Sequence, residues 1–531
     1  MTARTGNLER VLDPPGPSAL RPVRAPSRTL AEVAARLGLP VPDLPDVPAG
    51  HRRQQVVRGV THDSRTVQPG DLYAALPGTH AHGADFADLA VRAGAVACLT
   101  DGGGEGRARA AGLPTYVVDD PRRVLGQLAA WVYGEPAAEL LMIGITGTNG
   151  KTTTAYLLDA GLRATGATTG LIGTIETRIG DEVLASVRTT PEAPDLQALL
   201  AVMLERGVGV GVMEVSSHAL ALGRVDGTTY DVAVFTNLSE DHLDFHADLE
   251  DYYAVKASLF TPGRSRSGVV NVDDEFGARL AREASVPVMT VSPSGGTAQW
   301  RVTDADLGPR GSTFTLLGPA GERVRSGTAL VGDFNLVNAA LALVALAGAG
   351  VDLERAAEGV LACPGVAGRM ERVVAADVGA DGPLALVDFA HSPDALARVL
   401  ATCRGLLGPG GRLVVVLGAG GDRDPYKRPV MGEIAARAAD VVVLTNDNPR
   451  SEEPGVILAA LRAGAGGVPS TTVEVVPERR AAIERAVALV GPGDVVVVAG
   501  KGHEQGQEID GVVHPFDDRL VLQEALGLVR R

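Results

Sequence analysis

The stretch from Gly144 to Thr154 constrains the fold more than any other part of the sequence. It contains three glycines, follows the apolar residues 140–143 and precedes the largely apolar residues 155–158. This order predicts a buried strand, a glycine-rich turn and the first turn of a helix, which together form a phosphate-binding P-loop. Backbone N–H groups in such a turn face the anion, Lys151 neutralises it, and the hydroxyl of Thr152 can ligate Mg2+.

One position of this loop departs from the standard pattern. A strict GxxxxGKS/T motif has glycine five residues before Gly150, and this chain has Ile145 there. We therefore interpret the loop as a variant P-loop. The alternative, a glycine-rich turn that binds nothing, fits less well because a Gly-Lys-Thr sequence stands between a strand and a helix.

Composition favours a multidomain α/β protein. A chain of 531 residues predicts about three or four domains at ~150 residues each. Its hydrophobic content of 45%, in Val-rich runs and Ala/Leu-rich stretches, is typical of soluble α/β proteins, and we expect no membrane insertion. A net charge of -15 and an aromatic content of 4% argue against nucleic-acid binding.

The cysteines predict neither a metal site nor a disulfide framework. Cys98, Cys363 and Cys403 are scattered along the chain, and their expected role is core packing. Because the N-terminus also lacks the apolar segment of a signal peptide, we expect a cytoplasmic protein.

Changes in composition along the chain predict a tail and three domains. Residues 1–28 are rich in proline and arginine and are expected to form a disordered tail. Residues 29–140 predict a small α/β domain, and residues 141–361 predict the P-loop domain, in which short alternating runs within 299–331 add antiparallel strands. Residues 362–531 alternate strands with helices. The predicted fold class is therefore α/β, with a central P-loop NTPase-like parallel sheet carrying added antiparallel strands and a C-terminal Rossmann-like domain.

Two strands of the predicted P-loop domain end in acidic and imidazole side chains. The strand at 208–215 ends beside Glu214, and the strand at 232–236 runs into a loop that contains His242. Ligands of open parallel sheets bind at the carboxyl ends of strands, and acids beside a polyphosphate repel it unless a divalent cation intervenes. Glu214 and His242 are therefore candidate metal ligands, although either could be a solvated loop residue.

Four other residues are open to two interpretations from local physics. Ser64 could bind a nucleotide diphosphate or only shape a turn. Asn335 and Asn338 lie about one turn apart on a predicted helix, so they could bind a nucleobase, or Asn335 could cap the helix. Lys256 lies in a predicted helix and resembles a surface lysine whose stem covers apolar area.

Four polar loops follow strands of the C-terminal domain. Because the carboxyl ends of parallel strands lie on one edge of a sheet, these loops predict a single binding site, unless each is an ordinary turn. The glycines from Gly418 to Gly421 do not match GxGxxG, which disfavours a dinucleotide site. The loops comprise residues 388–393, 418–424, 447–450 and 500–504.

Motifs in several parts of the chain carry a family resemblance. They lie at residues 146–152, 214–218, 237–242 and 388–393. Together they closely resemble the ATP-dependent Mur ligases, from about Val56 to the C-terminus, and Ile145 is that family's own form of the P-loop. Within the family, residues 447–450 (Asp-Asn-Pro-Arg) are similar to the signature of members that add meso-diaminopimelate rather than L-alanine, D-glutamate or D-alanyl-D-alanine.

The resemblance implies peptide-bond synthesis in the cytoplasm, with ATP and Mg2+ as cofactors. It implies that UDP-N-acetylmuramoyl-L-alanyl-D-glutamate and meso-diaminopimelate are joined through an acyl phosphate to make a peptidoglycan precursor. We expect the protein to be a monomer.

The resemblance also implies roles for individual residues. Lys151, Glu214, His242 and Lys256 would be catalytic, with Lys256 carbamylated so that it ligates metal together with Thr152, Glu214 and His242. ATP would contact Gly147, Thr148, Asn149, Gly150, Lys151, Thr152, Thr153, Asn335, Asn338, Arg369 and Asp388. The UDP-muramoyl peptide would contact Ser64, Thr189, Thr190, Ser217 and Arg224. Diaminopimelate would contact Arg423, Asp447, Asn448, Pro449, Arg450, Gly500 and Glu504, with Arg450 on the carboxylate that L-lysine lacks.

Two rival functions remain from the sequence. The nearer is a related Mur ligase that adds L-lysine. The other is a P-loop NTPase of another class, in which hydrolysis drives binding or movement, but such a protein has no evident need for an amino-acid-shaped pocket in the C-terminal domain.

Overall fold

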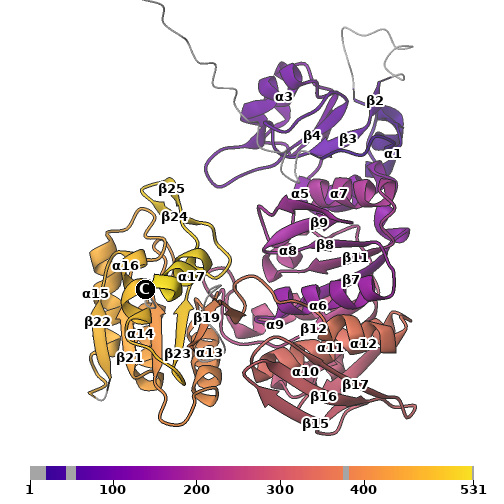
Figure 1. Cartoon of the computed structure of the whole chain (residues 1–531). Coiled ribbons are helices and arrows are strands. Elements are labelled where there is room, and N and C mark those ends of the chain that lie inside the picture. Colours follow the sequence, from indigo (N-terminus) through magenta and orange to yellow (C-terminus); the bar gives the residue numbers. More distant parts are fainter. Residues whose placement is uncertain (1–19, 43–54, 375–381, 470, 529–531) are drawn as a thin grey trace, which may run out of the picture. The chain divides into compact units, whose positions relative to one another are not determined.

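The computed structural model describes residues 20–42, 55–374, 382–469 and 471–528 (Figure 1). The chain divides into two compact units. Unit 1 contains residues up to Gly144, residues 167–231 and residues 263–265, and unit 2 contains residues 145–166, 232–262 and those from Arg266 onward. Strand β7 (Leu141–Thr146) leads from unit 1 into unit 2. The boundaries of the three domains expected from the sequence stay a prediction.

Unit 1 starts with a small α/β fold on a parallel sheet in the order β3-β4-β5-β6. α5 (Pro121–Val132) begins at Pro121 because the Asp120 carboxylate accepts hydrogen bonds from the N–H groups of Arg122 and Arg123. Buried side chains lie on both faces of the sheet. The other elements are α1 (Leu30–Leu37), β3 (Gly59–Thr61), β4 (Asp71–Ala75), α3 (Ala87–Ala93), β5 (Ala97–Thr100), α4 (Glu105–Ala110) and β6 (Thr115–Val117).

Part of the segment expected to be a disordered tail is held against unit 1. The Arg21 guanidinium lies 3.3 Å from the Asp71 carboxylate, and the Val23 N–H donates to Glu205 over 2.9 Å. Arg28 donates to the Trp131 carbonyl and stacks on its ring. The prediction of disorder is therefore wrong for residues 20–28, because partners far away in the sequence hold them, while residues 1–19 lie outside the described residues.

The remainder of unit 1 surrounds a parallel pair of strands. β8 (Thr169–Ile172) pairs with β11 (Val210–Glu214), and β9 (Glu176–Ile179) and β10 (Glu182–Ala185) form an antiparallel hairpin that continues from β8. α7 (Ala193–Glu205) and α8 (Ser217–Ala221) complete it. β11 ends at Glu214, at the strand end where the sequence predicted an acid.

Unit 2 contains the P-loop helix and both kinds of strand pairing expected for this part of the chain. β13 (Ser265–Asn271), β14 (Val288–Ser292) and β15 (Trp300–Gly308) pair in parallel, and β16 (Gly311–Leu317) and β17 (Arg323–Thr328) then add antiparallel strands. The predicted antiparallel addition is confirmed. The other elements here are α6 (Lys151–Ala164), β12 (Tyr230–Phe235), α9 (Leu249–Ala257), α10 (Glu275–Glu283), α11 (Asp333–Gly348) and α12 (Leu353–Leu361).

The C-terminal part of unit 2 is the doubly wound sheet that the sequence predicted. Its strand order is β18-β19-β23-β20-β21-β22, and all pairs except β18–β19 are parallel. The strands are β18 (Glu371–Arg372), β19 (Leu384–Asp388), β20 (Leu413–Leu417), β21 (Val441–Leu444), β22 (Thr472–Val475) and β23 (Val495–Ala499). The helices are α13 (Pro393–Gly405), α14 (Lys427–Ala438), α15 (Pro454–Ala465), α16 (Arg479–Val487) and α17 (Asp518–Leu528), and the hairpin β24 (Gly506–Ile509) and β25 (Val512–Pro515) precedes α17.

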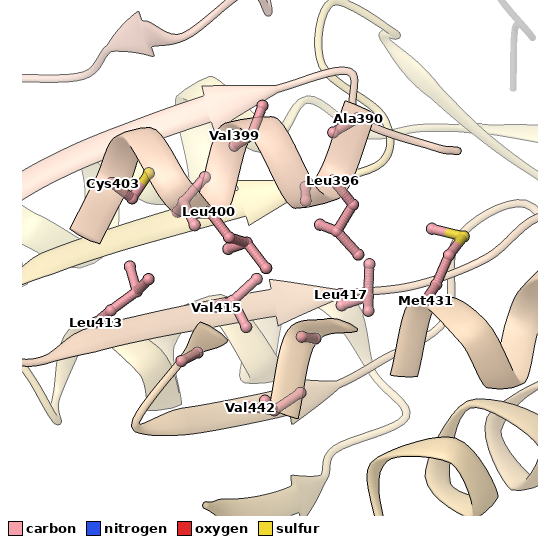
Figure 2. Close-up of a cluster of buried hydrophobic side chains, with 14 of the residues drawn as sticks. Ala390, Leu396, Val399, Leu400, Cys403, Leu413, Val415, Leu417, Met431 and Val442 are labelled. Atoms are coloured by element: carbon pink, nitrogen blue, oxygen red, sulfur yellow. The ribbon is translucent and has the colours of Figure 1, made fainter. Parts of the chain in front are cut away.

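Alternate residues of these strands enter two different cores. Leu413, Val415 and Leu417 of β20 pack against α13, as Figure 2 shows, and α14 and α15 cover the same face. Val414 and Val416 face the opposite core with α16 and α17. Burial on both faces explains the nearly continuous valine runs from which the strands were predicted.

We expect one buried ion pair to contribute strongly to the stability of this domain. Arg479 and Asp518 are paired by two hydrogen bonds of 2.7 Å, and both side chains are fully buried. Arg479→Met should lower the free energy of unfolding by about 3–5 kcal/mol, because it leaves a buried carboxylate without its partner. The pair of Arg485 with Glu474 at the surface offers the control, and Arg485→Met should cost far less, because solvent screens an exposed ion pair. Urea unfolding followed by circular dichroism measures both, and equal losses would contradict the expectation.

The burial of the cysteines agrees with their expected role in core packing. Cys98, Cys363 and Cys403 are all buried, and Cys98 and Cys403 lie within hydrophobic clusters. In the part of the chain that the structure describes, no helix combines the length and apolarity needed to cross a bilayer.

Candidate active site

The P-loop takes a backbone conformation that requires its glycines. Gly147 and Gly150 have φ angles of 148° and 87°, which side chains disfavour. A Cβ at Gly147 would overlap the hydroxyl of Thr236, and a Cβ at Gly150 would overlap the amide oxygen of Asn338. The loop is therefore shaped by β12 and α11 as well as by its own sequence.

Asn237, the second residue after β12, fixes the middle of the loop. Its carbonyl accepts the N–H of Thr148 over 2.9 Å, and its side-chain oxygen accepts the N–H of Asn149 over 3.0 Å. Its amide group also donates to the Asn149 carbonyl over 3.1 Å. The sequence placed Asn237 in a candidate loop without assigning it this role.

Two lysines converge on one carbonyl of the loop. Lys151 Nζ donates to the Gly147 carbonyl over 2.8 Å, and Lys256 Nζ donates to the same oxygen over 2.8 Å. Lys151 also donates to the Thr148 carbonyl over 2.9 Å. The structure thus brings Lys256 to the predicted phosphate site from a position 109 residues away.

The interpretation of Lys256 as a surface lysine is wrong. Its relative exposure is 1%, and its ammonium lies 4.5 Å from the centre of the Tyr252 ring. Burial, with a smaller contribution from the charge of Lys151, lowers the pKa of Lys256 well below its ordinary value. Burial therefore favours the neutral amine of Lys256, the form of lysine that can act as a nucleophile.

His242 lies near Lys256 but is more exposed. Its φ angle is 56°, its side chain is 42% exposed, and its ring stands edge-on to Tyr252 with the centroids 6.2 Å apart. Its Nε2 lies 3.7 Å from a carboxylate oxygen of Asp241. Both groups that the resemblance assigned to metal binding therefore contact the ring of Tyr252.

The two asparagines of α11 are joined to each other and to the P-loop helix. Asn338 donates to the side-chain oxygen of Asn335 over 3.1 Å and accepts from the Thr154 hydroxyl over 3.4 Å. Asn335 is buried inside the helix and donates to the Val331 carbonyl, and the N-cap is Gly332. The alternative in which Asn335 caps the helix is therefore wrong.

Arg369, in the C-terminal domain, contacts the P-loop helix α6, and Asp388 lies close to Arg369. A guanidinium nitrogen of Arg369 lies 3.4 Å from the Thr152 hydroxyl, and the group stacks on the Phe389 ring at 4.6 Å. The Asp388 carboxylate accepts the N–H of Met370 over 2.7 Å. Burial raises the pKa of Asp388 to about 6, although the charge of Arg369 opposes the increase. Three predicted ATP contacts thus lie within one connected group.

Asp394, at the start of α13, connects the P-loop to the C-terminal domain and was not predicted. Its carboxylate accepts hydrogen bonds from the Asn149 side chain over 3.2 Å and from the Ser239 hydroxyl over 2.9 Å. The local signal was only an acid in the first turn of a helix, which helix-dipole stabilisation explains equally well.

In unit 1, Glu214 is connected to the predicted substrate residues Thr189 and Thr190. Its buried carboxylate accepts from the Thr174 N–H over 2.7 Å and from the Thr174 hydroxyl over 3.1 Å. The Thr174 hydroxyl lies 3.0 Å from that of Thr189, and Thr190 donates to the Glu214 carbonyl over 2.8 Å. A Cβ at Gly173 would lie 2.5 Å from the carboxylate, so the approach depends on glycine.

The remaining predicted substrate residues of unit 1 occupy separate local environments. Ser64 hydrogen-bonds the hydroxyl of Tyr73, which donates to the Gly83 carbonyl over 2.8 Å. Ser217 is buried at the start of α8, and Arg224 lies 2.9 Å from the Glu192 carboxylate. Glu192, which the sequence analysis did not select, is thus in direct contact with a predicted residue.

All four predicted C-terminal loops are joined by contacts, and the loop after β19 meets the loop after β23 where the Gly500 N–H donates to the Asp388 carbonyl over 3.1 Å. Asn448 donates to the Glu504 carboxylate over 2.8 Å, which joins the loop after β21 to the loop after β23. Arg450 donates to the Gly421 carbonyl over 2.6 Å, which joins the loop after β20. A Cβ at Gly500 would lie 2.5 Å from the Asp447 carboxylate. Pro449 lies between Asn448 and Arg450, and Arg423 is exposed in the loop after β20.

Lys501 lies at the centre of this group and was missed as a site residue. Its fully buried ammonium donates to the Asn448 side chain over 2.7 Å and to Glu504 over 3.0 Å, and it lies 3.9 Å from Asp447. A lysine between two glycines directly after a buried strand was the available signal. Lys501 contacts three residues that the resemblance assigned to amino-acid binding, namely Asp447, Asn448 and Glu504.

The hairpin β24–β25 orients Arg450. The Arg450 N–H donates to the Glu508 carbonyl over 3.1 Å, and the Arg450 Nε lies 3.4 Å from the Glu508 carboxylate. Arg450 has a φ angle of 53°, an uncommon conformation for arginine. The guanidinium is therefore held in place from both sides of the loop.

Two cavities were found, one in each unit. One of about 210 Å3 in unit 1 is lined by residues that include His62, Arg188, Glu192 and Asp195. A larger one of about 330 Å3 is lined by α9 and α10, and its lining contains no residue that the sequence predicted. Over the described ranges, no three His, Cys, Asp or Glu side chains cluster in a way that could hold a metal ion.

Three family models match most of the chain. The Mur ligase family catalytic domain matches residues 56–133, the Mur ligase middle domain matches 145–346, and the Mur ligase glutamate ligase domain matches 368–502.

Known proteins resemble the chain over nearly its whole length. A UDP-N-acetylmuramoyl-L-alanyl-D-glutamate–2,6-diaminopimelate ligase of Streptomyces avermitilis is 57% identical over 96% of this chain and 98% of its own. A solved structure of a ligase with the same name has a TM-score of 0.65 and 32% identity, covering 95% of this chain and 100% of that one. The MurF ligase of Thermotoga maritima in complex with ADP has a TM-score of 0.59 at 18% identity over 89% and 97% of the chains, which supports the fold alone.

Proposed function

Because this chain belongs to the Mur ligase family, we propose that it joins meso-diaminopimelate to UDP-N-acetylmuramoyl-L-alanyl-D-glutamate with hydrolysis of ATP to ADP and phosphate. The product is a tripeptide precursor of peptidoglycan. The observation that carries the choice of amino acid is the contact group of Asp447, Asn448, Arg450 and Glu504 at the strand ends of the C-terminal domain.

The reaction has two chemical steps. The γ-phosphate of ATP passes to the side-chain carboxylate of the D-glutamyl residue, which gives an acyl phosphate and ADP. The amine of diaminopimelate then attacks the acyl carbon, and the tetrahedral intermediate collapses to an amide and phosphate. The first step brings one anion to another, so the protein must neutralise charge. Lys151, at the P-loop, is the cation of this chain placed for that role.

We assign the nucleotide to the P-loop and the group around it. The P-loop glycines, Asn338 against Gly150, and Arg369 against Thr152 form one connected surface in unit 2. The family models support ATP dependence. The Arg369 guanidinium, stacked on Phe389, offers a planar cation for the nucleotide.

The metal assignment depends on modification of Lys256. Mg2+ prefers oxygen ligands, and Thr152 and Glu214 offer a hydroxyl and a buried carboxylate, whereas the amine of Lys256 does not suit it. Addition of CO2 to the neutral amine, with loss of a proton, would give a carbamate with two oxygens. We keep Thr152, Glu214, His242 and carbamylated Lys256 as proposed Mg2+ ligands on the chemistry of their donor atoms alone. When bound, Mg2+ neutralises charge on the transferring phosphoryl group.

We propose that the C-terminal loops select diaminopimelate over L-lysine. Diaminopimelate carries a second amino-acid centre, whose carboxylate matches the fork of an arginine and whose ammonium matches an acid. Arg450 is held by the Gly421 carbonyl and by Glu508. We assign the distal carboxylate to Arg450, and the remaining contacts to Arg423, Asp447, Asn448, Pro449, Gly500 and Glu504.

We place the nucleotide-sugar peptide in unit 1. Thr189 and Thr190 are tied to Glu214, and Arg224 lies beside Glu192. Ser64, Ser217 and Arg224 complete the proposed set. We also propose that the protein works in the cytoplasm as a monomer and binds no nucleic acid, in keeping with its composition.

Release of ADP in the presence of different amines tests this function. With UDP-N-acetylmuramoyl-L-alanyl-D-glutamate and ATP present, meso-diaminopimelate should support turnover at least about tenfold better than L-lysine, because loss of a charged hydrogen bond costs ~1.5–3 kcal/mol. D-alanyl-D-alanine should support none. A preference for L-lysine would favour the related ligase, and ADP release without any amine would favour an NTPase.

A further inference from the structure

Three arginines of unit 1 converge on the carboxylate of Glu192. Arg188 and Arg224 lie 2.7 Å and 2.9 Å from its Oε1, and Arg122 lies 3.2 Å from its Oε2. Glu192 is only 6% exposed. One negative charge therefore faces three positive charges, and the group carries an excess of two positive charges.

This group borders the cavity of about 210 Å3 in unit 1. Arg188 and Glu192 line the cavity together with Asp63 and Asp195. Asp63 is paired with Arg65 at 2.6 Å, so its charge is already balanced locally. Burial raises the pKa of Asp195 to about 6, so this carboxyl is still mostly ionised near neutral pH. Of the three arginines on Glu192, Arg188 lines the cavity, where its guanidinium suits an anionic ligand.

A carboxylate is needed to hold three guanidinium groups so close together, because like charges repel. A guanidinium has five N–H donors in a rigid fork, whereas a carboxylate has two oxygens. Glu192 therefore contacts only some of the N–H donors of Arg188 and Arg224. Because it holds both guanidinium groups, it also fixes the direction in which their remaining N–H donors point. Pre-oriented arginines of this kind bind carboxylates with geometric specificity.

We infer that Glu192 is a positioning residue that holds Arg188 and Arg224 for the anionic dipeptide of the UDP-muramoyl substrate. The inference rests on the proposed function, which supplies the substrate. Glu192 precedes α7 directly and follows Thr189 and Thr190, two proposed contacts to the same substrate. The carboxylates of the L-alanyl-D-glutamate portion are the chemical group that the arginines recognise.

Glu192→Gln tests the inference because glutamine has the same shape without the charge. The KM for UDP-N-acetylmuramoyl-L-alanyl-D-glutamate should rise at least about tenfold, which corresponds to ~1.4 kcal/mol. The KM values for ATP and meso-diaminopimelate should stay within about twofold. In calorimetry, binding of UDP-N-acetylmuramate, which lacks the dipeptide, should weaken less than binding of the dipeptide form.

Glu182 provides the matched control, since it pairs with Arg206 on the surface of the same unit. Glu182→Gln should leave every constant unchanged. Glu192→Asp keeps the charge on a shorter side chain and should give an intermediate KM, which tests the inference if the glutamine variant fails to fold. An unchanged KM in Glu192→Gln, or equal weakening of both UDP ligands, would overturn it. Wild-type protein that cannot bind or extend the dipeptide nucleotide would instead overturn the proposed function and the inference together.

Discussion

Lys256→Ala is expected to abolish ligation while leaving nucleotide binding intact. We expect turnover to fall at least about a hundredfold, in the range for loss of a group that stabilises the transition state electrostatically. The physical reason is that the buried amine, once carbamylated, would supply oxygen ligands that no neighbouring side chain replaces. ADP release measures turnover, and calorimetry with ADP should give an affinity within about twofold of the wild type.

Lys256→Arg separates the carbamate from a simple positive charge. Arginine keeps a cation and can donate to the Gly147 carbonyl, but it does not form a carbamate, so this variant should be as inactive as Lys256→Ala. Tyr253→Phe, on the same helix, loses only a hydrogen bond to Glu283 and should retain activity. A carbamate carbon signal in 13C NMR with labelled bicarbonate should be present in the wild type and absent from both lysine variants. Full turnover by Lys256→Ala would rule out the carbamate role.

Arg450→Ala is expected to raise the KM for meso-diaminopimelate at least about tenfold. A charged hydrogen bond contributes ~1.5–3 kcal/mol, and every ~1.4 kcal/mol is a factor of ten. The KM for ATP should not change, because the contacts of Arg450 are with Gly421 and the hairpin that carries Glu508. Initial rates of ADP release at varied diaminopimelate concentration provide the measurement.

A comparison of diaminopimelate with L-lysine as substrates of the same variant gives a stricter test. L-lysine lacks the distal carboxylate, so its low activity should be nearly the same in Arg450→Ala and in the wild type. Arg485→Ala, which removes an exposed arginine paired with Glu474 in the same domain, serves as the control. If the kinetic constants for diaminopimelate are unchanged in Arg450→Ala, Arg450 does not bind this substrate. If activity with both amines falls equally, the substitution disturbs the loop in general.

The sequence predicted the fold best where secondary structure depends on local patterns. The alternation of strands and helices predicted for residues 362–531 is present, with β20, β21 and β23 as valine-rich strands, because burial on both faces leaves a continuous apolar signal. The strand, turn and helix of the P-loop were likewise recognised from neighbouring residues, since Gly147 and Gly150 are required by their own φ angles. The prediction of a tail failed for residues 20–28, whose order depends on contacts such as that of Arg21 with Asp71.

For the candidate site, prediction was limited to the types of residue that the loops present. The sequence placed Asp447 to Arg450 beside residues 500–504, and the contact of Asn448 with Glu504 agrees with that arrangement. It did not identify Glu192, which belongs to no local chemical pattern, and it included Lys501 only as a member of the loop 500–504. Their importance comes from partners elsewhere in the chain, such as Arg122, which lies 70 residues from Glu192.

The sequence by itself determined that a P-loop precedes α6 and that polar loops follow parallel strands, because glycine conformation and hydrophobic periodicity are properties of consecutive residues. Only the tertiary structure decided the state of Lys256. Its depressed pKa arises from burial and from the charge of Lys151, 105 positions earlier in the sequence. Desolvation and Coulomb interactions depend on distances in space, so local sequence suggested a surface lysine where the fold places a buried amine.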